Sequence, residues 1–319
     1  MALKELSFQS YNGRDTVKAW VYVPIRKPRA IVQVVHGLGE HSRRYLHLIL
    51  KLNEAGFVVC ADDHVGHGKT AADSGTWGDY GDKGFITTIE DEKSLHDLVV
   101  KDYPDLPFVM FGHSWGSMIV RGFAAHYGSL LAGLVICGTC GIMEAMQPVA
   151  KEVKALIDAG KGSERDPKWL GIMFAGWTSR YERVRSPSDW ISADPDVVAD
   201  HAADPFNNLY NAPTNQSNYD LAALVESITG PQWAEKVPGD LPVYNIAGDQ
   251  DPVGNYGEGV YAVTNWLVNT GHRRVATKLY SGHRHEIHND RDIREEVADG
   301  IISFINGILH LPSPFTAFT

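Results

Sequence analysis

The sequence predicts an α/β fold with a mostly parallel central sheet that helices cover on both faces. Two observations carry this prediction. Short apolar runs alternate with segments of helical periodicity as far as residue 139. The runs at residues 30–35, 57–61 and 132–137 are almost continuously apolar, which is typical of strands buried on both faces. At 319 residues, the chain is long enough for one large domain with an insertion.

The N-terminal part is expected to form an antiparallel hairpin, because residues 6–10 and 17–23 alternate around the turn signal Asn12-Gly13. Strands and helices then follow in turn, with a long loop ending near Gly84. In order, the pattern predicts a strand at 30–35, a helix from about 46, a strand at 57–61, a helix at 89–102, a strand at 108–111, a helix from about 117 and a strand at 132–137.

The regular alternation stops between residues 141 and 239. This segment has helical pieces such as 149–159 and irregular connections rich in Pro and Asp. The pattern then resumes with a strand at 242–247, a helix at 260–268, a strand at 275–280 and a helix at 292–308. We therefore expect a core made of residues 1–140 and 240–319, with residues 141–239 inserted as a mainly helical cap.

Composition and charge narrow the functional class. A net charge of −10 argues against nucleic acid as a partner, because no basic stripe is available to neutralise phosphates. The N-terminus lacks an apolar leader, and no run of eighteen apolar residues suggests a membrane span, so a cytoplasmic protein is expected. The three cysteines are expected to be buried thiols. The apolar tail at 311–319 is expected to pack on the body or on a second subunit, which allows a homodimer.

The stretch Gly112-His113-Ser114-Trp115-Gly116 matches the G-x-S-x-G pattern between a strand and a helix. A tight strand-to-helix turn of this kind exposes the serine hydroxyl, and its glycines avoid steric collisions. Ser114 is therefore a candidate nucleophile. The backbone N–H of Trp115, at the positive end of the helix dipole, is a candidate donor to an oxyanion.

A serine nucleophile needs a base and an orienting carboxylate, and both are expected in loops after strands. Asp249 and Asp251 follow one strand, and Asp251 is favoured because it lies deeper in the loop. His283, His285 and His288 follow the next strand, and spacing alone does not choose between them.

The loop after the first buried strand reads His36-Gly37-Leu38-Gly39. Its small residues beside a turn allow close approach to the candidate serine, so the backbone N–H of Leu38 is the expected second oxyanion donor. His36, Gly37 and His113 are candidate substrate contacts on this side of the site.

Five motifs in this order resemble the monoacylglycerol lipase and lysophospholipase-like branch of the α/β-hydrolases, a serine aminopeptidase-type group. They are His36-Gly37-Leu38-Gly39-Glu40-His41-Ser42, Asp63-His64-Val65-Gly66-His67-Gly68, Gly112-His113-Ser114-Trp115-Gly116, Asp249-Gln250-Asp251-Pro252-Val253 and Gly282-His283-Arg284-His285-Glu286.

The resemblance implies the α/β-hydrolase fold with a cap, covering nearly the whole chain. It implies Ser114 as nucleophile, Asp251 as acid, His285 as base, and the N–H groups of Leu38 and Trp115 as oxyanion donors. The implied reaction is hydrolysis of small acyl esters such as monoacylglycerol or lysophospholipid through an acyl-enzyme, without a cofactor or metal. Many relatives carry Met where this chain has Trp115, a departure that narrows the expected acyl pocket.

Apolar and aromatic residues of the cap are expected to line an acyl slot, with Met173, Phe174 and Trp177 as the candidate substrate contacts. The wider cap set also contains Met143, Met146, Trp190, Phe206 and Tyr210.

Three alternatives remain. A metal-dependent hydrolase would use His283, His285 and His288 together with Asp62, Asp63, His64 and His67 as ligands. A peptidase of the prolyl-aminopeptidase kind would need acidic cap residues for a substrate amine, for which Glu144, Glu152, Asp158 and Glu164 are available. A binding module on a hydrolase scaffold is disfavoured because nucleophile, acid and base all have candidates.

Overall fold

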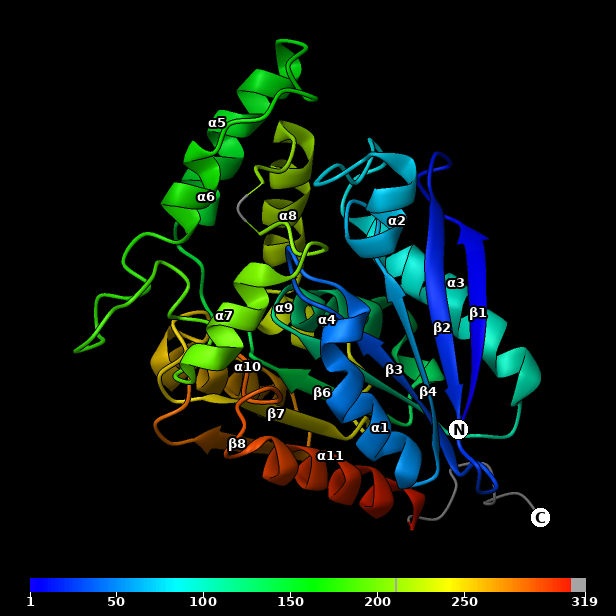
Figure 1. Cartoon of the computed structure of the whole chain (residues 1–319). Coiled ribbons are helices and arrows are strands. Elements are labelled where there is room, and N and C mark those ends of the chain that lie inside the picture. The colour runs from blue at the N-terminus through cyan, green and yellow to red at the C-terminus, as the bar shows by residue number, and fades with distance from the viewer. Residues whose placement is uncertain (210, 311–319) are drawn as a thin grey trace.

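A single mixed sheet forms the centre of the molecule in a computed structural model that describes residues 1–209 and 211–310. Its strands are β1 (Ala2–Gln9), β2 (Thr16–Val23), β3 (Ala30–Val35), β4 (Phe57–Asp63), β5 (Phe108–His113), β6 (Gly133–Cys137), β7 (Val243–Gly248) and β8 (Val275–Tyr280). Among the described residues the order is β1-β2-β4-β3-β5-β6-β7-β8 (Figure 1). The β1–β2 and β2–β4 pairs are antiparallel and the others are parallel, which confirms the predicted fold class.

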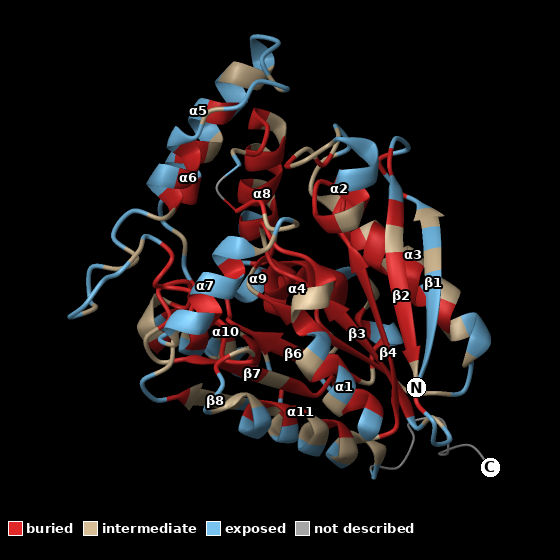
Figure 2. Cartoon of the chain, viewed as in Figure 1, coloured by how far each residue is buried: buried red, intermediate tan, exposed pale blue. Residues whose placement is uncertain are grey.

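Helices cover both faces of the sheet because alternate strand residues point to opposite sides. In β3, Val32 and Val34 pack with α1 and α11, whereas Ile31 and Val35 belong to the core formed with α3, α4 and α10. Figure 2 shows the strands at the centre as almost wholly buried. These helices are α1 (Leu46–Glu54), α3 (Ile86–Asp102), α4 (Trp115–Tyr127), α10 (Glu258–Asn269) and α11 (Arg294–Leu309).

The chain between β6 and β7 is helical. It contains α5 (Met146–Asp158), α6 (Lys168–Met173), α7 (Pro195–Ala203), α8 (Asn215–Ser227) and α9 (Pro231–Ala234). Val149, Val153 and Trp169 form a small apolar cluster of their own at α5 and α6. Trp190 and Leu221, by contrast, join the main core, so the segment is anchored directly on the body of the protein.

The pattern did not place every helix individually, and α2 and α8 are two examples. The short α2 (Gly68–Ser74) lies within the expected long loop and ends at Gly75, whose φ of 76° stops the helix. The longer α8 begins after Thr214, which caps it by accepting from the N–H of Ser217. Seven residues are too few for a helical period to be recognised, and α8 carries buried polar residues that obscure its apolar face.

The three cysteines are buried free thiols, as expected. No helix within residues 1–209 and 211–310 is both long and apolar enough to cross a membrane. The expected packing of the tail at 311–319, and the expected place of Tyr210 in the cap, lie outside the described residues.

Gly116 gives a test of the packing around the turn between β5 and α4. A Cβ at Gly116 would lie 2.1 Å from the carbonyl oxygen of Val35, and the backbone there has no room to move away. We predict that Gly116→Ala lowers the free energy of unfolding by about 3 kcal/mol or more. The matched control is Gly307→Ala in α11, where a Cβ meets open space and the change raises stability by up to about 1 kcal/mol. Chemical denaturation measures both, and similar effects at the two positions would refute the prediction.

Candidate active site

Ser114 lies on the sharp turn between β5 and α4. Its backbone has φ 56° and ψ −120°, a conformation that residues other than glycine rarely adopt. Two backbone hydrogen bonds hold it, from Ser114 N–H to the carbonyl of Cys137 at 3.0 Å and from Ser117 N–H to the carbonyl of Ser114 at 2.8 Å. The loop after β3 lies against this turn, because a Cβ built on Gly37 would be 3.1 Å from the Cβ of Ser114.

Asp251 and His285 are paired in the loops after β7 and β8. The Nδ1 atom of His285 lies 2.8 Å from Oδ2 of Asp251, and Oδ1 of Asp251 accepts the N–H of Val253 at 2.9 Å. Nδ1 is therefore the protonated nitrogen, and Nε2 has no hydrogen-bond partner among the described residues. Burial of the ring opposes its charged form, but the Asp251 carboxylate outweighs this effect and raises the pKa of His285.

The neighbouring acid and histidines make other contacts. Asp249 accepts the N–H of Gly282 at 2.8 Å and so ties the two loops together. His283 bonds to Asp290 at 2.9 Å, and His288 stacks on the ring of Tyr45. Of the alternatives that spacing leaves open, the geometry therefore pairs Asp251 with His285.

The two expected oxyanion donors lie on either side of Ser114. No described residue accepts a hydrogen bond from the backbone N–H of Leu38 or of Trp115. Trp115 is the first residue of α4, where N–H groups have no partner within the helix and the dipole favours negative charge. Both N–H groups are thus available to a ligand.

The loop that carries Leu38 is held by the buried carboxylate of Glu40. Oε1 of Glu40 accepts the N–H of Gly37 at 2.7 Å and the hydroxyl of Tyr45 at 2.6 Å. The guanidinium of Arg44 donates to Glu40 at 3.3 Å and to Glu286 at 2.6 Å. Burial alone would raise the pKa of Glu40, but His113 and Arg44 hold it well below its usual value. Sequence reasoning quoted Glu40 within a motif and gave it no role.

His36 and His113, expected as substrate contacts, are both buried and bonded to the protein. His113 joins the hydroxyl of Tyr45 at 2.9 Å to the carbonyl of His285 at 3.3 Å. His36 accepts the N–H of His64 at 3.1 Å through Nε2, and its ring stacks on that of His64. These contacts position the loops around the site.

Aromatic residues of the inserted segment reach His285. The ring of Trp177 lies 4.6 Å from those of Phe174 and Trp190, and the ring of Trp190 lies 5.0 Å from that of His285. Met173 is buried in the same core. Trp190 was placed in the cap by the sequence but was not singled out, because nothing local shows that it touches His285.

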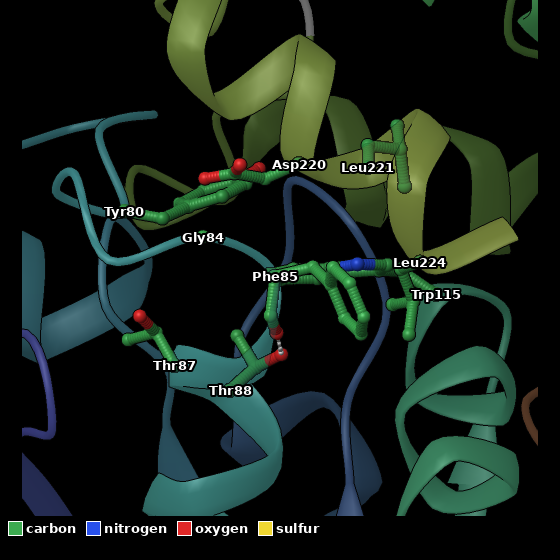
Figure 3. Close-up of a pocket in the computed structure, with 9 residues that line it drawn as sticks. All are labelled: Tyr80, Gly84, Phe85, Thr87, Thr88, Trp115, Asp220, Leu221 and Leu224. Carbon is green, nitrogen blue, oxygen red and sulfur yellow. Dashed lines mark hydrogen bonds between the residues drawn. The ribbon is translucent and has the colours of Figure 1, made fainter. Parts of the chain in front are cut away.

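The indole of Trp115 packs against the rings of His67 and Tyr80, with centroid distances of 4.9 Å and 5.0 Å. It borders a narrow cavity (Figure 3), which is also lined by Tyr80, Gly84, Phe85, Thr87, Thr88, Asp220, Leu221 and Leu224. Oδ2 of Asp220 is buried without a hydrogen-bond partner among the described residues, and burial raises the pKa of this carboxyl to about 7. No sequence motif indicated Asp220.

The metal and peptidase alternatives find little support in the geometry. Among the described residues, the group of His, Cys, Asp and Glu side chains that lie close enough together to hold a metal ion consists of Asp62, His64 and Glu92. None of the three C-terminal histidines belongs to it. Burial opposes a charge on His64, but the carboxyl groups of Asp62 and Glu92 outweigh it and raise the pKa of His64 to about 9. The four cap acids considered for an amine site, Glu144, Glu152, Asp158 and Glu164, are exposed.

Comparison with known proteins identifies the family of the chain. The family described as "Serine aminopeptidase, S33" matches residues 26–292. A monoacylglycerol lipase of Mycolicibacterium smegmatis is 29% identical over 290 residues, which cover 89% of this chain and 91% of that protein. Among solved structures, a highly thermostable carboxyl esterase from Bacillus coagulans in complex with glycerol is 64% identical, with TM-score 0.95 over 97% of this chain and 99% of that one.

A structure described as a lipase in an open form is 39% identical, with TM-score 0.91 over 97% of this chain and all of that one. The family match spans more than half of the chain, and the fold agrees throughout. The chain therefore belongs to the serine aminopeptidase, S33 family of α/β-hydrolases and is a serine ester hydrolase.

Proposed function

We propose that the chain hydrolyses acyl esters through an acyl-enzyme formed on Ser114. The observation that carries this proposal is the buried His285–Asp251 pair, which leaves Nε2 of His285 without a partner while Ser114 sits on the strained turn at the carboxyl end of β5. A histidine oriented in this way is a general base for a serine hydroxyl.

In the first half of the reaction, Oγ of Ser114 attacks the ester carbonyl and its proton moves to Nε2 of His285. The Asp251 carboxylate stabilises the imidazolium and holds its tautomer. The N–H groups of Leu38 and Trp115 receive the oxyanion, where one such donor contributes roughly 10²–10³ in rate. His285 then gives its proton to the leaving alcohol. Water repeats these steps on the acyl-enzyme and releases the acid.

The substrate class we infer is monoacylglycerol, lysophospholipid or a similar small acyl ester. The names of the M. smegmatis relative and of the glycerol-bound esterase support an acylglycerol. The rings of Phe174 and Trp177 pack against Trp190, and Trp190 contacts His285. Together they offer the apolar surface that an acyl chain needs. The division into core and cap, the homodimer and the cytoplasmic location stay predictions.

The first test is hydrolysis of p-nitrophenyl esters from acetate to palmitate, with monoacylglycerol and an aminoacyl amide alongside. We expect the wild-type protein to cleave esters, and Ser114→Ala to lose at least about 10⁴-fold in turnover because the nucleophile is gone. The chain-length optimum reports how much acyl chain the inserted segment encloses. Unchanged far-UV circular dichroism shows that the variant is folded. Ester turnover that survives in Ser114→Ala would exclude the proposed nucleophile, and cleavage of the amide alone would favour a peptidase.

The second test compares the two aspartates of one loop. Asp251→Asn removes the acceptor of the Nδ1 proton and is expected to lower kcat/KM by about 10⁴-fold. Asp249→Asn, the matched control, weakens a loop contact and is expected to cost less than about tenfold.

The pH dependence of activity tests the direction of the pKa shift of His285. Wild-type activity should fall as the pH drops through a value above 6.5, because His285 must be neutral to act as a base and its pKa is raised. In Asp251→Asn the residual activity should keep its acid limb at a lower pH, since the carboxylate that favours the imidazolium is absent. The assignment of Asp251 would be wrong if the two variants lost kcat/KM equally. It would also be wrong if the wild type and Asp251→Asn had the same acid limb.

A further inference from the structure

Four arginines gather at an open groove on the edge of the inserted segment. The groove is open to solvent and is lined by Arg180, Tyr181, Glu182, Arg183, Arg185, Ala193, Gln250, Gly282 and Arg284. The chain as a whole is acidic, with 39 Asp and Glu against 29 Lys and Arg. A groove with four cationic side chains and a single lining carboxylate is therefore a marked local reversal of charge.

Most of this positive charge has no carboxylate partner. Arg185 pairs with Asp189 at 3.3 Å. Within residues 1–209 and 211–310, no Asp or Glu lies within ion-pair distance of Arg180, Arg183 or Arg284. A carboxylate or phosphate brought to the groove would meet these guanidinium groups without having to break an existing ion pair.

Aromatic rings hold two of the guanidinium groups in place. Arg180 lies 4.0 Å from the ring centroid of Tyr256, and Arg284 lies 3.9 Å from that of Tyr181. Arg284 also donates to the backbone carbonyl of Ser192 at 3.1 Å. Stacking fixes the plane of a guanidinium while leaving donors at its edge available, so these side chains need little ordering when they bind an anion.

The groove joins the inserted segment to the catalytic loops. The hydroxyl of Tyr181 donates to the carbonyl of Gln250 at 2.9 Å, and Gln250 directly precedes Asp251. Arg284 directly precedes His285. The arginines at 180, 183 and 185 belong to the long connection between α6 and α7, which projects from the body at the left of Figure 1. Whatever binds the groove lies beside the loops of the active site.

We propose that this arginine groove docks the enzyme on an anionic lipid surface by binding phosphate groups of the lipids. The inference rests on the proposed function, because a hydrolase of acyl lipids gains from lying where its substrate partitions. Val184 stands between two of the arginines with 48% of its surface exposed, and Ile172, on the neighbouring helix α6, is 42% exposed. Basic side chains that flank exposed apolar ones match the boundary between headgroups and acyl chains.

The test is sedimentation with vesicles of phosphatidylcholine alone and of phosphatidylcholine mixed with phosphatidylglycerol. We expect preferential binding to the mixed vesicles. Each basic residue near such a surface strengthens binding roughly fivefold, so Arg180→Gln/Arg183→Gln should lower the partition coefficient by roughly 30-fold. The single variant Arg183→Gln, which leaves the stacking on Tyr256 intact, should lower it roughly fivefold.

The matched control is Arg26→Gln/Lys27→Gln, which removes two exposed charges from the connection between β2 and β3. It should retain wild-type vesicle binding. All variants should hydrolyse a soluble p-nitrophenyl ester at the wild-type rate, so failure of docking is distinguishable from failure of the proposed function.

Three results would overturn the docking proposal. The first is equal binding to both vesicle types, and the second is an equal loss of binding in the control variant. The third is wild-type binding to mixed vesicles in Arg180→Gln/Arg183→Gln, which would show that the groove does not carry the docking.

Discussion

The buried carboxylate of Glu40 is the contact on which the geometry of the active site depends. It accepts the N–H of Gly37, which lies next to the turn between β5 and α4. Arg44 joins it to Glu286, in the loop after β8. An ion this far from water is tolerated only when neighbouring groups replace its hydration. Removing Arg44 would leave two carboxylates buried without their cation. The loop after β3 and the loop after β8 therefore keep their relative position as long as this group of charges is intact.

The same rigidity accounts for the strained backbone at Ser114. A residue at φ 56° costs on the order of 1–3 kcal/mol and persists only where its surroundings fix it. Here the surroundings are close contacts of backbone with backbone. A Cβ at Gly112 would lie 2.3 Å from the carbonyl oxygen of Gly116, and one at Gly116 would strike that of Val35. The two glycines of the motif thus let β5, α4 and β3 approach closely enough to hold the serine on its turn.

The sequence was sufficient to predict the buried strands and the turn at Ser114, because both depend on local sequence pattern. The buried strands are almost continuously apolar, and the glycines around Ser114 mark a turn that few other residues permit. Contacts between residues that are far apart in the sequence have no such local pattern. Arg44 and Glu286 are 242 residues apart, so the local sequence does not show the ion pair that ties the Glu40 loop to the loop after β8. Three histidines within six residues are equivalent by spacing, and the fold alone turns His285 towards Asp251. Asp220 likewise gains its surroundings from distant segments.

The charge around His285 follows from how the loops are packed. The carboxylates of Asp251, Glu286 and Glu40 all raise the pKa of His285, so its inner surroundings are acidic. Arg284 precedes it in the chain, yet its guanidinium turns away to stack on Tyr181 and to donate to backbone carbonyls of the inserted segment. Because field strength between charges falls with distance and with solvent between them, the arginine groove can carry positive charge without suppressing protonation of the base. One loop thus presents an acidic interior to the reaction and a basic edge to the solvent.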